Sequence, residues 1–319
     1  MPAAADSAAT GAPRVGYLGP PGTFSEQALL TQADLAAGVL VELPSITDVI
    51  EATANGDVDF GVVPLENAIE GAVNVTLDTL AFDADLLLQR EIVIAVQMNL
   101  LGLTGATLPA IRQVLTIPVA TAQCRSFLRK ELAHAAVLPA SSTAEAAQQV
   151  VAGGDPSVAA IGTELAARLY GLEVLARDIE DHPENETRFG VVARGSIPAP
   201  TGHDKTSIVV FQKADEPGSL LAILQEFAAR AINLTNLHSR PTKRGLGDYC
   251  FFIDLEGHVA DELVADCLRD LKSKQADVKF LGSYPATGEH GERVRRDADA
   301  AWRQADAWVR DLRGRIGSR

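Results

Sequence analysis

The chain has 319 residues, a length that predicts two or three domains instead of one small module. Hydrophobic residues make up 47% and charged residues 22%, the balance of a folded protein with a large core. The formal charge of −14 excludes nucleic acid and anionic membranes as expected partners, so an anionic ligand must be held by a local device such as a helix N-terminus or an arginine.

Cysteine and histidine usage argues against disulfides and metals. The three cysteines, Cys124, Cys250 and Cys267, form no CxxC pair, and the six histidines stand singly. Residues 1–13 have neither a basic region nor an apolar core, so they predict a flexible tail and not a signal peptide. No apolar run reaches the roughly 18 residues that a membrane helix needs. We therefore expect a soluble cytoplasmic protein without metal or cofactor.

From residue 14 to about residue 177, short β-branched runs alternate with alanine-rich segments of helical periodicity. This alternation is typical of an α/β fold with largely parallel sheets. Residues 86–103 predict one long strand, and residues 187–194 predict another. Two α/β lobes with chain crossings between them would place a ligand cleft at their interface. Helices are predicted at 24–37, 47–54, 119–131 and 143–151.

Residues 195–204 are rich in proline and glycine and predict a linker. Strands and helices then follow in the order βαββαβ over roughly 80 residues, the ferredoxin-like arrangement. Beyond residue 285, apolar residues recur at intervals of mostly four and three, which predicts a helix with one apolar stripe. The stripe consists of Val294, Ala298, Trp302, Ala305, Val309, Leu312 and Ile316. It must pack against the protein's own body or against another subunit, and the sequence leaves both open.

The segment GPPGTFSE at residues 19–26 follows a predicted strand and opens a helix. Thr23 and Glu26 have the spacing of a capping box, so a well-capped helix is the favoured interpretation. An anion site is the alternative, because free N–H groups and the hydroxyls of Thr23 and Ser25 converge at the positive helix end. The glycines fit neither a dinucleotide nor a nucleotide loop.

Two further polar segments lie at strand ends. Glu66 and Asn67 end a strand at the position where open α/β sheets bind ligands, although a turn that satisfies local backbone groups is equally well supported. Asn185, Thr187 and Arg188 lie where another strand begins, just after an acidic loop. There a surface ion pair is the favoured interpretation of the arginine.

In the βαββαβ region, the segment DEPGSL at residues 215–220 turns into the first helix, and HSRP at 238–241 closes the next strand. Turn chemistry explains both segments, and a small-ligand site at a subunit interface is the alternative. No nucleophile motif or catalytic triad pattern occurs in the chain, so hydrolase mechanisms lack support.

Taken together and in order, GPPGTFSEQA, VPLENAIEG, NETRF, DEPGSL and HSRP resemble the prephenate dehydratase family over about residues 14–285. The resemblance implies decarboxylating dehydration of prephenate to phenylpyruvate in phenylalanine biosynthesis, by a monofunctional enzyme. It implies a two-lobed catalytic region like a type 2 periplasmic binding protein. An ACT domain that binds L-phenylalanine and joins homodimers or homotetramers would follow. The alternatives are arogenate dehydratase and a non-catalytic amino-acid sensor.

The expected domain boundaries follow from this layout. A flexible tail covers residues 1–13, the catalytic region 14–194, the linker 195–204, the ACT domain 205–285 and the amphipathic C-terminal helix 286–319.

The resemblance also implies roles for individual residues. The implied substrate-binding residues are Thr23, Ser25, Asn67, Thr116, Gln123, Asn185 and Phe189. The implied effector residues are Pro217, Gly218, Ser219, Leu220, His238, Ser239, Arg240 and Pro241. The chain departs from the family at Ala68, Thr116, Ile117, Ser219 and His238. The last departure replaces a glutamate, which removes a charge that could meet the ammonium of an effector.

The catalytic residues are expected to be Thr187, Arg188 and Glu66. Prephenate is a dianion, so Arg188 and the capped helix after Gly22 would hold it. The Thr187 hydroxyl would donate a hydrogen bond to the departing ring hydroxyl, while Glu66 or water would supply the proton.

Overall fold

The structure is a computed structural model that describes residues 11–213, 216–243, 245, 248–275, 277–287, 304–305 and 307–315. The chain divides into two compact units. The first runs to Thr76 and resumes over Ile92–Phe189, and the second takes Leu77–Glu91 and the chain from Gly190 onward. Strands β5 (Leu87–Ala95) and β11 (Glu186–Ala193) each pass from one unit to the other.

The first lobe is built on a sheet with the strand order β2-β1-β3-β11-β5. Strand β1 (Arg14–Leu18) is parallel to both β2 (Val39–Leu43) and β3 (Phe60–Asn67). The short β4 (Gly71–Ala72) folds back antiparallel on the end of β3. The helices of this lobe are α1 (Phe24–Leu30), α2 (Ala33–Ala36), α3 (Ile46–Asn55) and α4 (Asn74–Asp78).

The second lobe has a five-stranded sheet with the order β10-β6-β9-β7-β8. Its strands are β6 (Asn99–Gly102), β7 (Gln113–Thr116), β8 (Ala136–Pro139), β9 (Val158–Gly162) and β10 (Glu173–Ala176). Strand β7 is parallel to β8 and β9, whereas β6 is antiparallel to β9 and β10. The helical elements are η2 (Leu108–Ala110), α5 (Pro118–Gln123), α6 (Arg125–Glu131), α7 (Thr143–Gly153) and α8 (Glu164–Tyr170).

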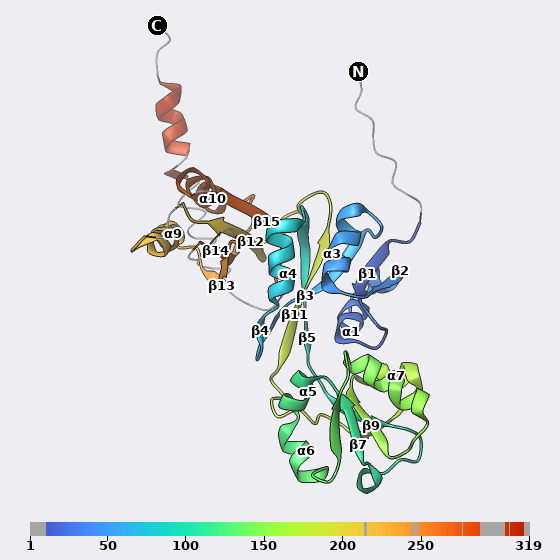
Figure 1. Cartoon of the computed structure of the whole chain (residues 1–319). Helices are drawn as coiled ribbons and strands as arrows, with labels where there is room; N and C mark the ends of the chain where they lie inside the picture. The colour runs from blue at the N-terminus through green and yellow to red at the C-terminus, as the bar shows by residue number, and fades with distance from the viewer. Residues whose placement is uncertain are drawn as a thin grey trace. The chain divides into compact units, whose positions relative to one another are not determined.

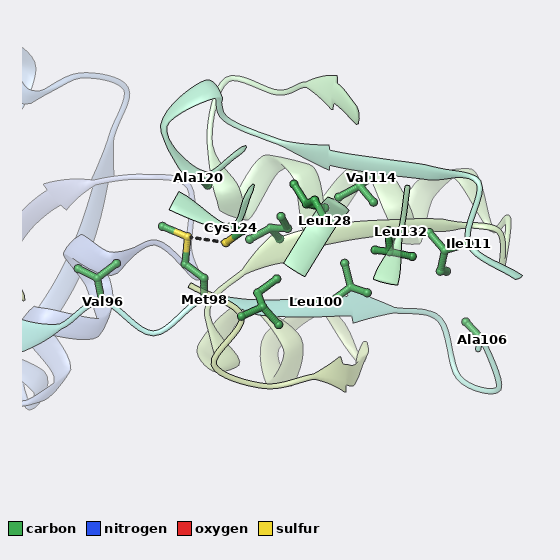
Figure 2. Packing of buried hydrophobic residues seen from close by; sticks show 13 residues of the cluster. Val96, Met98, Leu100, Ala106, Ile111, Val114, Ala120, Cys124, Leu128 and Leu132 are labelled. Carbon is green, nitrogen blue, oxygen red and sulfur yellow. Dashed lines mark hydrogen bonds between the residues drawn. The ribbon is translucent and has the colours of Figure 1, made fainter. Parts of the chain in front are cut away.

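Figure 2 shows one side of the core of this second lobe, where Leu100, Ile111, Val114 and Leu132 pack together. The thiol of Cys124 lies in the same core and donates to the sulfur of Met98 at 3.5 Å. Burial raises the pKa of the Cys124 thiol to about 12, so it is an inert core residue. Because Cys124 directly follows α5, its packing fixes the end of that helix.

The second unit contains a four-stranded antiparallel sheet with the order β13-β14-β12-β15 (Figure 1). Its elements follow as β12 (Asp204–Phe211), α9 (Ser219–Ala228), β13 (Leu234–Pro241), β14 (Tyr249–Glu256), α10 (Glu262–Lys274) and β15 (Asp277–Pro285). Apolar side chains of both helices pack on one face of this sheet. The chain order is therefore βαββαβ, as predicted, and the expected α/β class is confirmed.

The other face of this sheet is covered by the segment Leu77–Glu91, which includes the π-helix η1 (Thr79–Asp83). The rings of Phe82 and Phe211 meet edge to face with centroids 6.1 Å apart. Lys279 of β15 donates from Nζ to the carbonyls of Ala81 and Ala84, at 3.1 and 2.7 Å. This segment, which in sequence separates the two stretches of the first unit, therefore packs on the four-stranded sheet of the second unit.

The long strand predicted at 86–103 is wrong, because the chain there forms β5 and β6 in two different sheets. The backbone leaves the first sheet where the amide of Val96 donates to the Asn185 carbonyl and the amide of Met98 to the Glu180 carboxylate, both at 2.8 Å. The helices predicted at 24–37 and 119–131 are each divided in two.

Parts of the two predicted terminal segments lie outside the described residues. This applies to residues 1–10 and to four residues of the predicted apolar stripe, Val294, Ala298, Trp302 and Ile316. Residues 304–305 and 307–314 are helical, with Leu312 41% exposed. Over the described parts of the chain, no helix is both long enough and apolar enough to cross a membrane.

Candidate active site

Asn67 ends β3 and organises the turn that follows. Its Oδ1 accepts hydrogen bonds from the backbone amides of Ile69 and Glu70, each at 3.0 Å. This side-chain-closed turn leads to Gly71, whose φ of +79° favours glycine, and then into β4. Because the carbonyl oxygen of Asn67 is held by the turn, its NH2 group faces β11.

On β11, the Asn67 amide meets Thr187. Asn67 Nδ2 donates to Thr187 Oγ1 at 2.9 Å and to Asn185 Oδ1 at 2.9 Å. The Thr187 oxygen therefore accepts, and its hydroxyl hydrogen has no acceptor among the residues that the structure describes. Thr187 is partly exposed, so its O–H can donate to a ligand.

The second lobe adds Gln123, the last residue of α5. Asn185 Nδ2 donates to Gln123 Oε1 at 3.3 Å, and Gln123 Nε2 donates to Glu70 Oε1 at 3.2 Å. Asn185 is 1% exposed and Gln123 is 6% exposed. We call the connected side chains of Thr187, Asn67, Asn185, Gln123 and Glu70 the amide network. It brings together four predicted site residues and one, Glu70, that the motif interpretation missed.

Arg188 and Glu66 lie apart from this network. Successive residues of a strand point to opposite faces of the sheet, so Arg188 faces away from Thr187 and Glu66 faces away from Asn67. Arg188 Nη2 lies 3.4 Å from Glu66 Oε2, with 15% and 34% of the two side chains exposed. The structure thus groups the predicted catalytic residues as an Arg188–Glu66 ion pair on one face and Thr187 on the other.

Two further predicted site residues are buried. Phe189, on the same face of β11 as Thr187, is 2% exposed and belongs to the core. Thr116 ends β7, is fully buried, and its hydroxyl has no hydrogen-bond partner among the described residues. An unpaired buried hydroxyl costs about 1 to 3 kcal/mol, which is unusual at a purely structural position.

The loop before α1 is held by its own contacts. Thr23 Oγ1 donates to the Leu18 carbonyl at 2.9 Å and accepts from the Glu26 amide at 3.4 Å, as a capping threonine does. The Glu26 carboxylate accepts from the Gly22 amide at 2.5 Å and is buried beside the helix start. These contacts match the favoured structural interpretation of this loop, and substrate binding by Thr23 and Ser25 stays a prediction.

Gly22 also joins this loop to the second lobe. Its carbonyl accepts from the Thr163 hydroxyl at 2.6 Å, and its φ of +92° favours glycine. A Cβ at this position would lie 3.0 Å from Cα and Cβ of Ala166 on α8, so a side chain would displace that helix. The glycine is thus required by backbone conformation and by close packing together.

The predicted effector residues divide between two places in the second unit. Pro217 and Gly218, whose φ is +93°, form the turn into α9, and Ser219 and Leu220 are the first two residues of that helix. His238, Ser239, Arg240 and Pro241 end β13.

Arg240 points to the face of the sheet that carries the segment Leu77–Glu91. Its guanidinium donates to both oxygens of Asp78, at 2.9 and 2.8 Å, and Lys243 Nζ lies 3.1 Å from the same carboxylate. Asp78, at the end of α4, is another residue that sequence interpretation missed.

The chain is similar to known proteins over most of its length. The family model of prephenate dehydratase matches residues 15–197, and that of the ACT domain matches residues 206–273. A prephenate dehydratase of Mycolicibacterium vanbaalenii is 41% identical over 315 residues, which cover 94% of this chain and 98% of the relative. The solved structure of prephenate dehydratase in complex with L-Phe from Arthrobacter aurescens has a TM-score of 0.87 at 38% identity, covering 94% of this chain and 99% of that one. A structure described as GqqA, a quorum quenching acylase, has a TM-score of 0.77 at 28% identity and covers 86% of this chain and 98% of its own.

Proposed function

The chain belongs to the prephenate dehydratase family, and from this premise we propose that it converts prephenate to phenylpyruvate under regulation by L-phenylalanine. The observation that supports the catalytic assignment most directly is the orientation of Thr187. The Asn67 amide donates to the Thr187 oxygen, so the Thr187 hydrogen is directed away from Asn67 and can be donated to a substrate.

The reaction requires a hydroxyl group to leave a ring carbon while the ring carboxylate departs as carbon dioxide. The leaving oxygen gains negative charge as the carbon–oxygen bond breaks, and a proton from a solvent water molecule converts the departing hydroxide to water. A threonine hydroxyl is too weak an acid to supply that proton by itself. We assign to Thr187 a hydrogen bond that strengthens as charge develops on the leaving oxygen, which lowers the barrier.

Arg188 and the loop before α1 have smaller roles in this proposal than their motifs suggest. Arg188 pairs with Glu66 on the opposite face of the sheet, so we assign the pair to holding β3 and β11 in position. At the start of α1, the Glu26 carboxylate already accepts the hydrogen bond that the Gly22 amide could otherwise donate to a substrate. Ser25 has no hydrogen-bond partner for its hydroxyl among the described residues, so it is the side chain of this loop that we retain as a substrate contact.

The test is turnover of prephenate by the full-length chain, with arogenate as the competing substrate and phenylpyruvate formation followed spectroscopically. The wild-type chain should form phenylpyruvate. The shape-conserving variant Thr187→Val should lower kcat by about a hundredfold or more, as loss of one such donor does elsewhere, with KM within a few-fold. Thr187→Ser keeps the hydroxyl and should stay within about tenfold of wild type. A Thr187→Val variant with near-normal kcat would refute the role of Thr187, and preference for arogenate would change the substrate.

Phenylalanine regulation and self-association rest on the second unit. A relative binds L-Phe, and we propose that L-Phe binds the ACT domain of this chain next to the turn Pro217–Leu220. Exposed apolar side chains on the same domain, Leu221 at 58% and Leu237 at 39%, support association of two or more copies. Light scattering measures the mass of the assembly, and turnover with L-Phe compared with L-Tyr measures the inhibition.

We place the enzyme in the cytoplasm, where its three buried thiols would remain reduced.

A further inference from the structure

Glu70 lies at the far end of the amide network from Thr187. Its backbone amide is held by Asn67 Oδ1 in the turn after β3, and its carboxylate accepts from Gln123 Nε2. Glu70 is exposed, so its side chain fills no space in the core. The contact with Gln123 joins the turn of the first lobe to the end of α5 in the second lobe, across 53 residues of sequence.

Each amide in the network has a donor end and an acceptor end, so the network has a direction. An ionised carboxylate only accepts, so Glu70 requires Gln123 to present its NH2 group. The Gln123 oxygen then faces Asn185, whose NH2 group donates to it at 3.3 Å. The Asn185 oxygen in turn accepts from Asn67 at 2.9 Å.

The turn after β3 imposes the same direction from the other end. The backbone amides of Ile69 and Glu70 hold the Asn67 oxygen, so Asn67 presents its NH2 group to both Asn185 and Thr187. Rotation of Gln123 or Asn185 by 180° would set two donors or two acceptors face to face. With Glu70 in place, each end of the network therefore fixes the amides between them.

We propose that Glu70 is a positioning residue for the dehydratase reaction, acting through Gln123, Asn185 and Asn67 on the direction of the Thr187 hydroxyl. Its contribution is that of an acceptor at a fixed place. The carboxylate transfers no proton to the substrate, and its charge is not required. This inference rests on the proposed function and adds a residue to the same site.

Three substitutions separate contact from charge. Glu70→Gln loses the charge and keeps an oxygen at the same distance along the side chain, so it can still accept from Gln123. Glu70→Asp keeps the charge and withdraws the carboxylate by one methylene group, which breaks a contact that is 3.2 Å in the wild type. Glu70→Ala removes both. Glu51→Gln, at an exposed glutamate on α3, is the matched control.

The experiment measures kcat and KM of the full-length chain with prephenate for these variants. We expect kcat to fall roughly tenfold in Glu70→Ala and Glu70→Asp, with KM within about twofold and melting temperature unchanged. Glu70→Gln and the control should stay within about threefold of wild type. In a Thr187→Val background, Glu70→Ala should lower kcat by less than about twofold, because the residue through which it acts is already lost.

Several results would overturn the inference. If Glu70→Asp is active and Glu70→Gln is impaired, charge or proton transfer matters and the contact does not. If Glu70→Ala costs as much in the Thr187→Val background as alone, Glu70 does not act through Thr187. Normal kcat in Glu70→Ala removes any role. A wild-type chain that does not turn over prephenate would instead overturn the proposed function, and with it this inference.

Discussion

The ion pair between Arg240 and Asp78 yields a prediction that separates two roles of the predicted effector motif. A loss of phenylalanine inhibition in an Arg240 variant would ordinarily be interpreted as loss of a ligand contact. The structure instead places the guanidinium on Asp78, which is the last residue of α4 and belongs to the segment Leu77–Glu91. We therefore expect Arg240→Ala and Asp78→Ala to lower the free energy of local opening of the segment Leu77–Glu91 by the same amount.

The magnitude follows from the contacts. Asp78 accepts two hydrogen bonds from Arg240, and Lys243 Nζ lies 3.1 Å away, while 15% of the Asp78 side chain and 22% of the Arg240 side chain are exposed. Breaking a fully buried pair costs about 3 to 5 kcal/mol, and an exposed pair contributes about 0 to 1 kcal/mol. For this partly buried bidentate pair we expect each single variant to lower the free energy of opening of the segment Leu77–Glu91 by about 2 to 3 kcal/mol. The double variant should lower that free energy by little more than either single variant does.

Hydrogen exchange of Leu77–Glu91 is the assay, because it reports local opening independently of global unfolding. The expected cost corresponds to exchange that is roughly 30 to 150 times faster in each single variant. Arg177→Ala is the matched control, since the Arg177–Glu164 pair has a similar 2.9 Å separation but side chains 58% and 50% exposed. A coupling energy below about 0.5 kcal/mol would refute the pairing.

The same pair also predicts a pH dependence. Burial acts to raise the pKa of Asp78, but hydrogen bonds from Arg240 and Lys243 outweigh it and hold the pKa below its ordinary value of 3.8. A carboxyl group with a lowered pKa in the folded state stabilises that state above its unfolded pKa. The contribution is lost as the pH falls through the folded value. The coupling energy between Arg240 and Asp78 should therefore be full at neutral pH and disappear in acid below pH 3.8.

Two further predictions concern packing. Gly22→Ala should lower the free energy of unfolding by about 1 to 3 kcal/mol, because the new Cβ would sit on a left-handed backbone and only 3.0 Å from Ala166. Gly71→Ala, with a φ of +79° but open space around the new Cβ, should lower it by only about 1 kcal/mol. Equal losses of thermal stability in the two variants would contradict this prediction. Burial raises the pKa of all three cysteines to about 11 or 12, so iodoacetamide at pH 8 should leave the native chain unmodified and label three thiols in urea, as counted by mass spectrometry. Rapid labelling of a native thiol would count against that burial.

The fold could be predicted where the sequence carries a local period. The β-branched and alanine-rich alternation marks the α/β lobes, and the order βαββαβ is readable after the linker. The division of residues 86–103 between two sheets is not readable, because the apolar run continues through the break. Strand β5 ends where the backbone amides of Val96 and Met98 find acceptors on Asn185 and Glu180. Those acceptors are more than 80 residues away in sequence, and no local pattern encodes them.

The candidate site shows the same limit at the level of side chains. Motif adjacency suggested that Thr187, Arg188 and Glu66 act together, yet the alternation of a strand sends neighbouring side chains to opposite faces. That separation could have been predicted from the sequence alone.

The position of Glu70 could not have been predicted in this way. It depends on a turn closed by the Asn67 side chain and on an amide that α5 presents from the other lobe. A residue that acts by accepting one hydrogen bond from a distant amide has no chemical signature of its own in sequence. It becomes visible only when the direction of every donor in the network is followed from the carboxylate to Thr187.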